Sequence, residues 1–174
     1  IASVVQNKRT NFETDLLFPI IEYASQVSGV TYGADAAKDV SLKVIADHAR
    51  SMAIMIMDGI LPSNEGRGYV LRRILRRAIR HGRTLGIRDK FLEGAVDAVV
   101  KIYTGASDFE ELIKKQDYIK KVISLEEDRF AATLAQGTEL LDGHIAELKA
   151  AGKKVLDGAI GFKLYDTFGF PWEL

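Results

Sequence analysis

The sequence contains no cysteine in its 174 residues. This absence excludes disulfides, thiolate zinc sites and a cysteine nucleophile, and it fits a reducing compartment. The most apolar stretch, residues 52–57, is far shorter than the roughly 20 residues of a membrane-spanning helix. The first residues also lack the basic-then-apolar pattern of a signal peptide. We therefore predict a soluble cytoplasmic protein, and we expect a fragment because the sequence begins and ends within apparent structure.

A second absence is local, because residues 66–88 contain no Asp or Glu. The formal net charge of the whole chain is +0, yet eight of its 24 Lys and Arg residues are arginines between Arg67 and Arg88. The remaining sequence holds 16 basic and 24 acidic residues, a net charge of −8. Local field, rather than total charge, guides a polyanion to a surface. The neutral total therefore hides one strongly basic segment.

A chain of 174 residues with 47% hydrophobic residues is long and apolar enough to form one domain with a buried core. Apolar periodicity predicts helices joined by short loops, without internal repeats or long alternating strand patterns. The expected helices span about 14–28, 39–58, a segment after the loop at 61–68 that ends near 81, 89–103, a long region that reaches 150, and 158–167. The sequence predicts an all-α helical bundle with a long C-terminal helical hairpin region and a short terminal helix.

Local signals support several of these boundaries. Thr14 or a neighbour is expected to cap the first long helix, with Pro19 in its first turn and Gly29 as its stop. The helix over 39–58 is apolar nearly all round, so it should be the buried one, ended by Gly59.

The region from 107 to 150 contains two Ser-x-x-Glu patterns. Ser107 with Glu110, and Ser124 with Glu127, both fit the capping box that starts a helix. The region is therefore either two helices or one bent helix. Gly169 and Pro171 are expected to close the terminal helix.

The basic segment forms a helix with complete segregation of charge. Projected at 100° per residue from Arg72, the arginines fall within about 0–140° and the apolar side chains within about 160–340°. The arginines on this face are Arg72, Arg73, Arg76, Arg77, Arg80 and Arg83. Pairs four residues apart repel by roughly 0.2–0.5 kcal/mol each in an isolated helix. An anionic partner should offset this repulsion.

Two kinds of partner remain open at this point. Acidic helices of the same bundle could pair with the arginines through residues such as Glu110, Glu111, Glu126, Glu127 and Asp128. Alternatively, phosphates match the planar guanidinium group. We predict a mixture, in which arginines such as Arg73 and Arg77 bridge to carboxylates while the others, Arg72 and Arg76 first, face solvent.

Other candidate sites are weaker. His48, His81 and His144 lack any paired-ligand spacing, so no metal site is predicted. Asp47 and His48 are adjacent on a helix and should point about 100° apart, without a third partner for acid–base chemistry. The sequence contains no Walker loop, dinucleotide fingerprint or nucleophile elbow.

Two long motifs resemble a known family. The stretches "VIADHARSMAIMIMDGILPSNEGRGYVLRRILRRAIRHGRTLG" and "LYDTFGFPWEL" are similar to alanyl-tRNA synthetases, specifically to the helical tRNA-recognition domain that follows the class II catalytic domain. The segment "IASVVQNKRTNFETDLL" resembles the residues just after the last catalytic motif, so the likeness spans essentially the whole chain. Phe168 and Trp172 depart from the usual family residues, tyrosine and a smaller apolar side chain.

The resemblance implies a single helical domain over 1–174, with 1–10 as a remnant of the junction to the catalytic domain. The motifs that bind ATP and alanine would precede it, and the editing domain with its zinc ligands would follow. No cofactor is then expected here, whereas ATP, Mg and zinc belong to the parent. The implied partners are the acceptor stem of tRNA(Ala) and the catalytic and editing domains of the parent chain, with no membrane.

The resemblance also assigns roles to residues. In the family an acceptor-stem G·U wobble pair is the identity signal, and its unpaired guanine amino group lies in the shallow minor groove, where side chains can reach it. Asp166 matches the aspartate that accepts from this amine, and Asn64 matches the asparagine that contacts the same pair. Contacts to the RNA backbone are expected from Arg67, Arg72, Arg73, Arg76, Arg77, Arg80 and Arg83.

Overall fold

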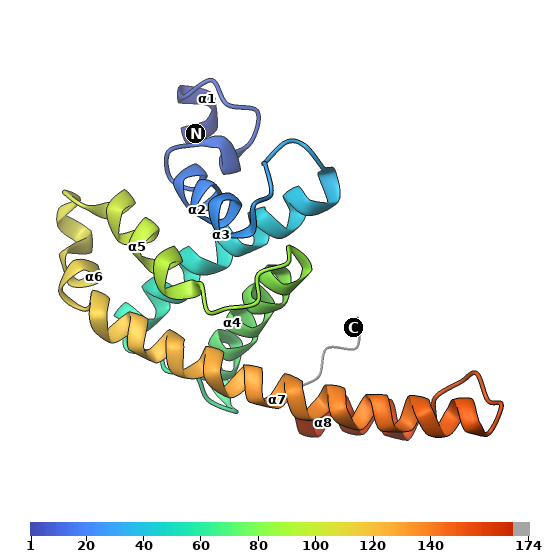
Figure 1. Ribbon diagram of the computed structural model, residues 1–174. Helices are drawn as coiled ribbons and strands as arrows, with labels where there is room; N and C mark the ends of the chain where they lie inside the picture. The colour runs from blue at the N-terminus through green and yellow to red at the C-terminus, as the bar shows by residue number, and fades with distance from the viewer. Residues whose placement is uncertain (169–174) are drawn as a thin grey trace. The chain divides into compact units, whose positions relative to one another are not determined.

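The computed structural model describes residues 1–168, which form eight α-helices, two 3-10 turns and no strand (Figure 1). The helices are α1 (Ala2–Val5), α2 (Phe18–Ser28), α3 (Ala36–Met57), α4 (Gly66–Thr84), α5 (Leu92–Tyr103), α6 (Glu110–Lys114), α7 (Gln116–Ala150) and α8 (Gly158–Phe168). The predicted all-α fold class is confirmed. The chain divides into two compact units, Ile1–Glu127 and the residues from Asp128 onward.

Helix α3 is the centre of the first unit, since it contacts α2, α4, α5 and α6. Its buried residues include Leu42, Ile45, Met52 and Ile56, each no more than 1% exposed. The side chain of Asp35 accepts hydrogen bonds from two backbone N–H groups in the first turn and thereby caps the helix. The prediction that this apolar helix is the buried one is confirmed.

Helix α2 begins four residues later than the sequence predicts. Thr14 does not cap it, because the Thr14 hydroxyl donates to the Asn11 carbonyl at 2.6 Å and the residue lies in a preceding turn. Pro19 lies in the first turn and Gly29 ends the helix with φ of +70°, as expected.

The two predicted capping boxes are wrong. Ser107 begins a 3-10 turn, Ser107–Phe109, and the helix that follows it has no side-chain cap. Ser124 lies inside α7, which runs unbroken to Ala150, and the real break falls at Lys115, between α6 and α7. A Ser-x-x-Glu pattern cannot start a helix at a position where tertiary packing already continues one.

Glu127 instead caps a different helix. One of its carboxylate oxygens, Oε1, accepts from the backbone N–H groups of Phe91 at 3.2 Å and Leu92 at 3.5 Å, at the start of α5. Burial raises the pKa of Glu127 to about 7, although these backbone hydrogen bonds and the charge of Lys90 act to lower it. Glu127 therefore ties the first part of α7 to α5.

The second unit contains the rest of α7 and α8. Residues 151–157 join them, with Gly152 at φ of +64°, and α8 runs back along α7 (Figure 1). Leu164 of α8 is buried. The terminal helix is confirmed, whereas Gly169, Pro171 and Trp172 lie outside the described residues.

Candidate nucleic-acid interface

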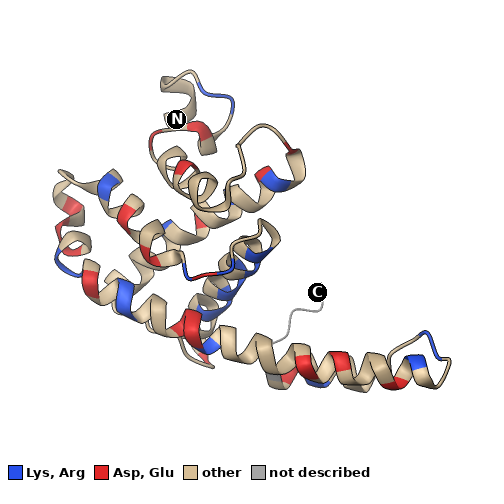
Figure 2. Ribbon diagram, in the orientation of Figure 1, with Lys and Arg blue, Asp and Glu red and all other residues tan. Residues whose placement is uncertain are grey.

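The arginine helix α4 packs its apolar face against α3. Leu71, Leu75, Ala78 and Ile79 are buried on this face, and Figure 2 shows the basic residues gathered along α4. The predicted segregation of arginines from the apolar face is confirmed. Val70, at the edge of the apolar face, is 50% exposed. Helix α4 therefore presents a basic surface that its own sequence leaves without carboxylates.

Arg72 and Arg76, here called the inner pair, share one buried carboxylate. Glu126 of α7 is 1% exposed, and its Oε1 accepts a hydrogen bond from Arg76 Nε at 3.3 Å. Arg72 Nε lies 3.0 Å from the same oxygen as an ion pair, without hydrogen-bond alignment. The two arginine side chains are only 17% and 26% exposed. The prediction that Arg72 and Arg76 lead the solvent-facing set is wrong.

Arg73 and Arg77, here called the outer pair, are exposed. The Arg73 guanidinium lies 5.8 Å from the centre of the Tyr69 ring, which is itself 42% exposed. Within residues 1–168 the ion pairs to Glu126 come from Arg72 and Arg76 and not from these two arginines, so the prediction that Arg73 and Arg77 bridge to carboxylates is also wrong. On the helical wheel the buried residues centre about 70° from Arg72 and about 170° from Arg73, so Arg72 borders the core and Arg73 points away from it.

The remaining basic residues of α4 differ in exposure. Arg67 is exposed, and Arg80 and Arg83 are half-buried. The guanidinium of Arg83 donates to the backbone carbonyl of Arg88 and so helps to fix the turn after α4. Of the acidic partners considered from sequence, Glu110 and Glu111 pair with lysines of their own segment instead.

Asn64 lies exposed in the loop between α3 and α4, and this loop is tightly tied to the start of α4. The backbone N–H of Ser63 donates to the Gly68 carbonyl at 3.1 Å, and the Ser63 hydroxyl donates to the Glu65 carbonyl at 2.8 Å. A Cβ atom at Gly68 would collide with the Ser63 hydroxyl and with the Leu61 carbonyl oxygen. Gly68 is thus required for the close approach of loop and helix, a role that the sequence analysis missed.

The side chain of Asn64 also has a direct partner on α4. The Nη1 atom of Arg72 donates a hydrogen bond to Asn64 Oδ1. Arg72 therefore contacts both the buried Glu126 and the exposed Asn64. Sequence spacing gave no sign of this contact, because it depends on the path of the loop.

Asp166 lies exposed on α8. Asn64 belongs to the first unit, whereas Asp166 belongs to the second. Its neighbour Tyr165 is 48% exposed. The roles of Asn64 and Asp166 in reading RNA stay predictions.

Among residues 1–168 no group of three or more His, Cys, Asp and Glu side chains is arranged to hold a metal ion. His48 Nδ1 lies 2.9 Å from Asp47 Oδ2, so the expectation that these neighbours point apart is wrong. Rotation about the side-chain bonds brings the two groups together, although their Cβ atoms diverge. His81 Nδ1 lies 3.0 Å from the hydroxyl of the buried Ser41 and links α4 to α3.

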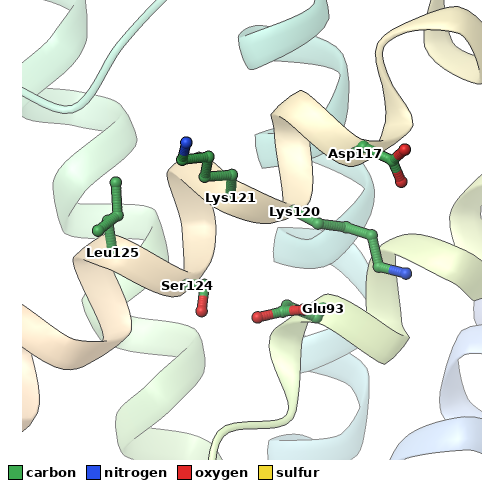
Figure 3. Close-up of a pocket in the computed structure, with 6 residues that line it drawn as sticks. All are labelled: Glu93, Asp117, Lys120, Lys121, Ser124 and Leu125. Carbon is green, nitrogen blue, oxygen red and sulfur yellow. The ribbon is translucent and has the colours of Figure 1, made fainter.

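A shallow polar hollow lies between α5 and α7 (Figure 3). Its lining residues are Glu93, Asp117, Lys120, Lys121, Ser124 and Leu125. Lys120 is paired with Asp97 at 2.6 Å, and Lys90 donates to Ser124 at 2.9 Å. These contacts within the first unit occupy polar groups at the rim of the hollow. They favour a structural role for the residues that line it.

Residues 1–174 match the family described as tRNA synthetases class II (A). The chain belongs to this class II tRNA synthetase family. It is 54% identical over 174 residues to an alanine–tRNA ligase of Thermoanaerobacter pseudethanolicus, 53% identical over 174 residues to one of Fusobacterium nucleatum, and 55% identical over 175 residues to one of Ligilactobacillus salivarius. Each alignment covers 100% of this chain and 20% of the relative. This class II synthetase chain thus spans about a fifth of the length of the relatives it matches.

The resemblance to alanyl-tRNA synthetases that the two motifs indicate is confirmed at the level of the family and of these relatives. None of the helices within residues 1–168 is both long enough and apolar enough to span a membrane.

Proposed function

We propose that this chain is the tRNA-binding segment of an alanine–tRNA ligase and that it contacts the acceptor stem of tRNA(Ala). The observation that supports this most is the outer pair, two exposed arginines one turn apart on a helix without acidic residues. The names of the relatives support the ligase assignment, and the geometry supplies a surface suited to phosphate.

The chemistry of α4 fits an RNA backbone. Guanidinium groups bind phosphate oxygens through two parallel N–H donors, and phosphate also relieves the repulsion between Arg73 and Arg77. The Tyr69 ring lies 5.8 Å from the Arg73 guanidinium and restricts its movement, so less entropy is lost on binding. We place Arg67 with the outer pair at this surface, since it is exposed at the start of the same helix.

We propose further that Asn64 and Asp166 read the G·U wobble pair. Phosphate contacts fix register, whereas base-edge contacts supply specificity. Both side chains are exposed and polar, as base readers must be.

The sites for ATP, Mg and alanine are proposed to lie elsewhere in the parent ligase, as is the zinc-containing editing domain. The parent ligase is proposed to act in the cytoplasm. This proposal rests on the resemblance to alanyl-tRNA synthetases, which places the ATP and alanine motifs before this segment. Pure chain should give no alanine-dependent pyrophosphate exchange. Exchange above background would show that the chain itself activates alanine.

A helical scaffold with internally paired arginines is the second candidate, and the contact of the inner pair with Glu126 favours it. The two candidates differ in the outer pair. In a scaffold the exposed arginines would have no role in recognising RNA. A scaffold should therefore bind acceptor-stem RNA no better than an unrelated duplex.

The experiment compares binding of two acceptor-stem hairpins that differ only in a G·U or a G·C pair. The unmodified chain should prefer the G·U stem, and N64A and D166A should each reduce that preference by about 1–3 kcal/mol with little change in binding to the G·C stem. Circular dichroism confirms folding of each variant. Equal affinity of the unmodified chain for both stems would reject G·U reading, and no binding to either would favour the scaffold.

A further inference from the structure

We propose that Arg72 is a positioning residue for Asn64: it fixes the asparagine amide with its oxygen directed inward and its NH2 group directed outward. This inference rests on the proposed function, in which Asn64 reads a base pair. It separates Arg72 from the arginines that bind phosphate.

The first step is that Arg72 is itself held in place. Its Nε lies 3.0 Å from Oε1 of Glu126, a carboxylate that is 1% exposed and belongs to α7. The guanidinium group is planar and rigid, so this ion pair at Nε restricts the positions that the Nη atoms can take. Arg76 Nε lies 3.3 Å from the same oxygen, one turn further along α4 and further from the loop.

The second step concerns the orientation of the asparagine amide. Arg72 Nη1 contacts the side chain of Asn64, and a guanidinium group has only donors. The amide atom that faces Arg72 must therefore be the acceptor, Oδ1. Rotation of the amide by half a turn would place two donors against each other, so the contact selects one orientation.

The third step is that the backbone of Asn64 is fixed independently. The hydrogen bond from Ser63 N–H to the Gly68 carbonyl, and the close approach at Gly68, tie the loop to α4 on either side of this residue. Only rotation of the Asn64 side chain is then left for Arg72 to restrict. A reader whose supporting contacts lock its rotamer discriminates better than a loosely held one.

The outward NH2 group determines what Asn64 recognises. As a donor, it requires an acceptor on the RNA, such as a pyrimidine O2, a purine N3 or a ribose 2′-hydroxyl in the minor groove. Asn64 thus reads acceptors, which complements the acceptor role proposed for Asp166. The side-chain oxygen of Asn64 is occupied by Arg72 and is not the reading atom.

The test uses R72K, R76K and N64D in the same hairpin assay. R72K keeps the positive charge but loses the planar group that contacts Glu126 and Asn64 together, so it should lower the G·U preference roughly 3- to 10-fold. R76K is the matched control, because Arg76 shares Glu126 but lies a turn further from the loop, and it should keep the preference. N64D, on an exposed loop, retains an acceptor for Arg72 but loses the outward donor, so it should lose the preference as N64A does.

A double-substituted chain, R72K with N64A, identifies the route of the effect. If Arg72 acts through Asn64, the double variant should show the same preference as N64A alone. An additive further loss, or an equal loss in R76K, would contradict the positioning role. Retention of the preference in N64D would show that the oxygen is the reading atom and would overturn the proposed orientation.

Failure of the proposed function gives a different result. If the unmodified chain shows no preference between the G·U and G·C stems, reading by Asn64 is rejected, and the role of Arg72 in reading is rejected with it. If the unmodified chain shows the preference and folded R72K retains it in full, only the positioning role is rejected.

Discussion

The inner and outer pairs of arginines on α4 have the same four-residue spacing and opposite surroundings. Arg72 and Arg76 converge on the buried Glu126, whereas Arg73 and Arg77 are exposed to solvent and Arg73 lies over the Tyr69 ring. A rotation of about 100° along the helix thus separates a structural contact from a candidate RNA contact. One continuous run of like charge therefore contains two kinds of arginine, and burial distinguishes them.

The largest expected effect is on the inner pair. E126A would leave two partly buried guanidinium groups without their shared carboxylate and should lower the free energy of unfolding by about 2–4 kcal/mol. Urea denaturation measures this change. E111A is the control, because Glu111 pairs with lysines at the surface, and it should leave stability unchanged. Equal stability of E126A and E111A would contradict the structural role of the contact between the inner pair of arginines and Glu126.

Glu127, the neighbour of Glu126, sharpens the comparison through pH. Its pKa is about 7 in the folded chain and near 4.5 when unfolded, so between these values the folded state binds the proton more strongly. Its contribution to stability is therefore largest below about pH 4.5 and declines as pH rises to about 7, by roughly 3 kcal/mol in total. The same decline should be absent in E127Q. Urea midpoints at pH 5 and pH 7.5 for both chains measure it, and identical pH profiles would contradict the assigned pKa.

A smaller effect is expected at the start of α4. G68A should lower the free energy of unfolding by about 1–3 kcal/mol, because the added methyl group meets the Leu61 carbonyl and Ser63. G143A is the matched control in α7, where nothing lies within 4 Å of the added atom. It should raise stability by about 0.5–1 kcal/mol through helix propensity. Similar changes in both variants would show that the loop is not tightly held.

Apolar periodicity predicted the helices because burial of one face determines most of them. It predicted that α3 is the buried helix, and the stop signal at Gly29 predicted the end of α2. The capping boxes failed because Ser124 and Glu127 make contacts to other elements, which short-range patterns do not report. Long-range packing, and not local propensity, decides the role of such residues.

The candidate site was predictable in part. The segregated wheel of α4 located the basic surface, and a closer reading of the same wheel would have placed Arg72 at the border of the core. The sharing of Glu126 and the contact of Arg72 with Asn64 could not be predicted. They join residues from α4, α7 and a loop, and their distances follow from the tertiary fold alone.

The most direct test of the account is the salt dependence of acceptor-stem binding in R73Q/R77Q. Each phosphate contact contributes roughly one unit to the slope of log K against log [salt], so loss of the outer pair should flatten the slope by about two units and weaken binding to G·U and G·C stems alike. The control K8Q/R9Q makes the same charge change at two exposed residues outside α4 and should alter the slope far less. An unchanged slope in folded R73Q/R77Q, or an equal change in the control, would contradict the central claim that the outer pair binds the RNA backbone.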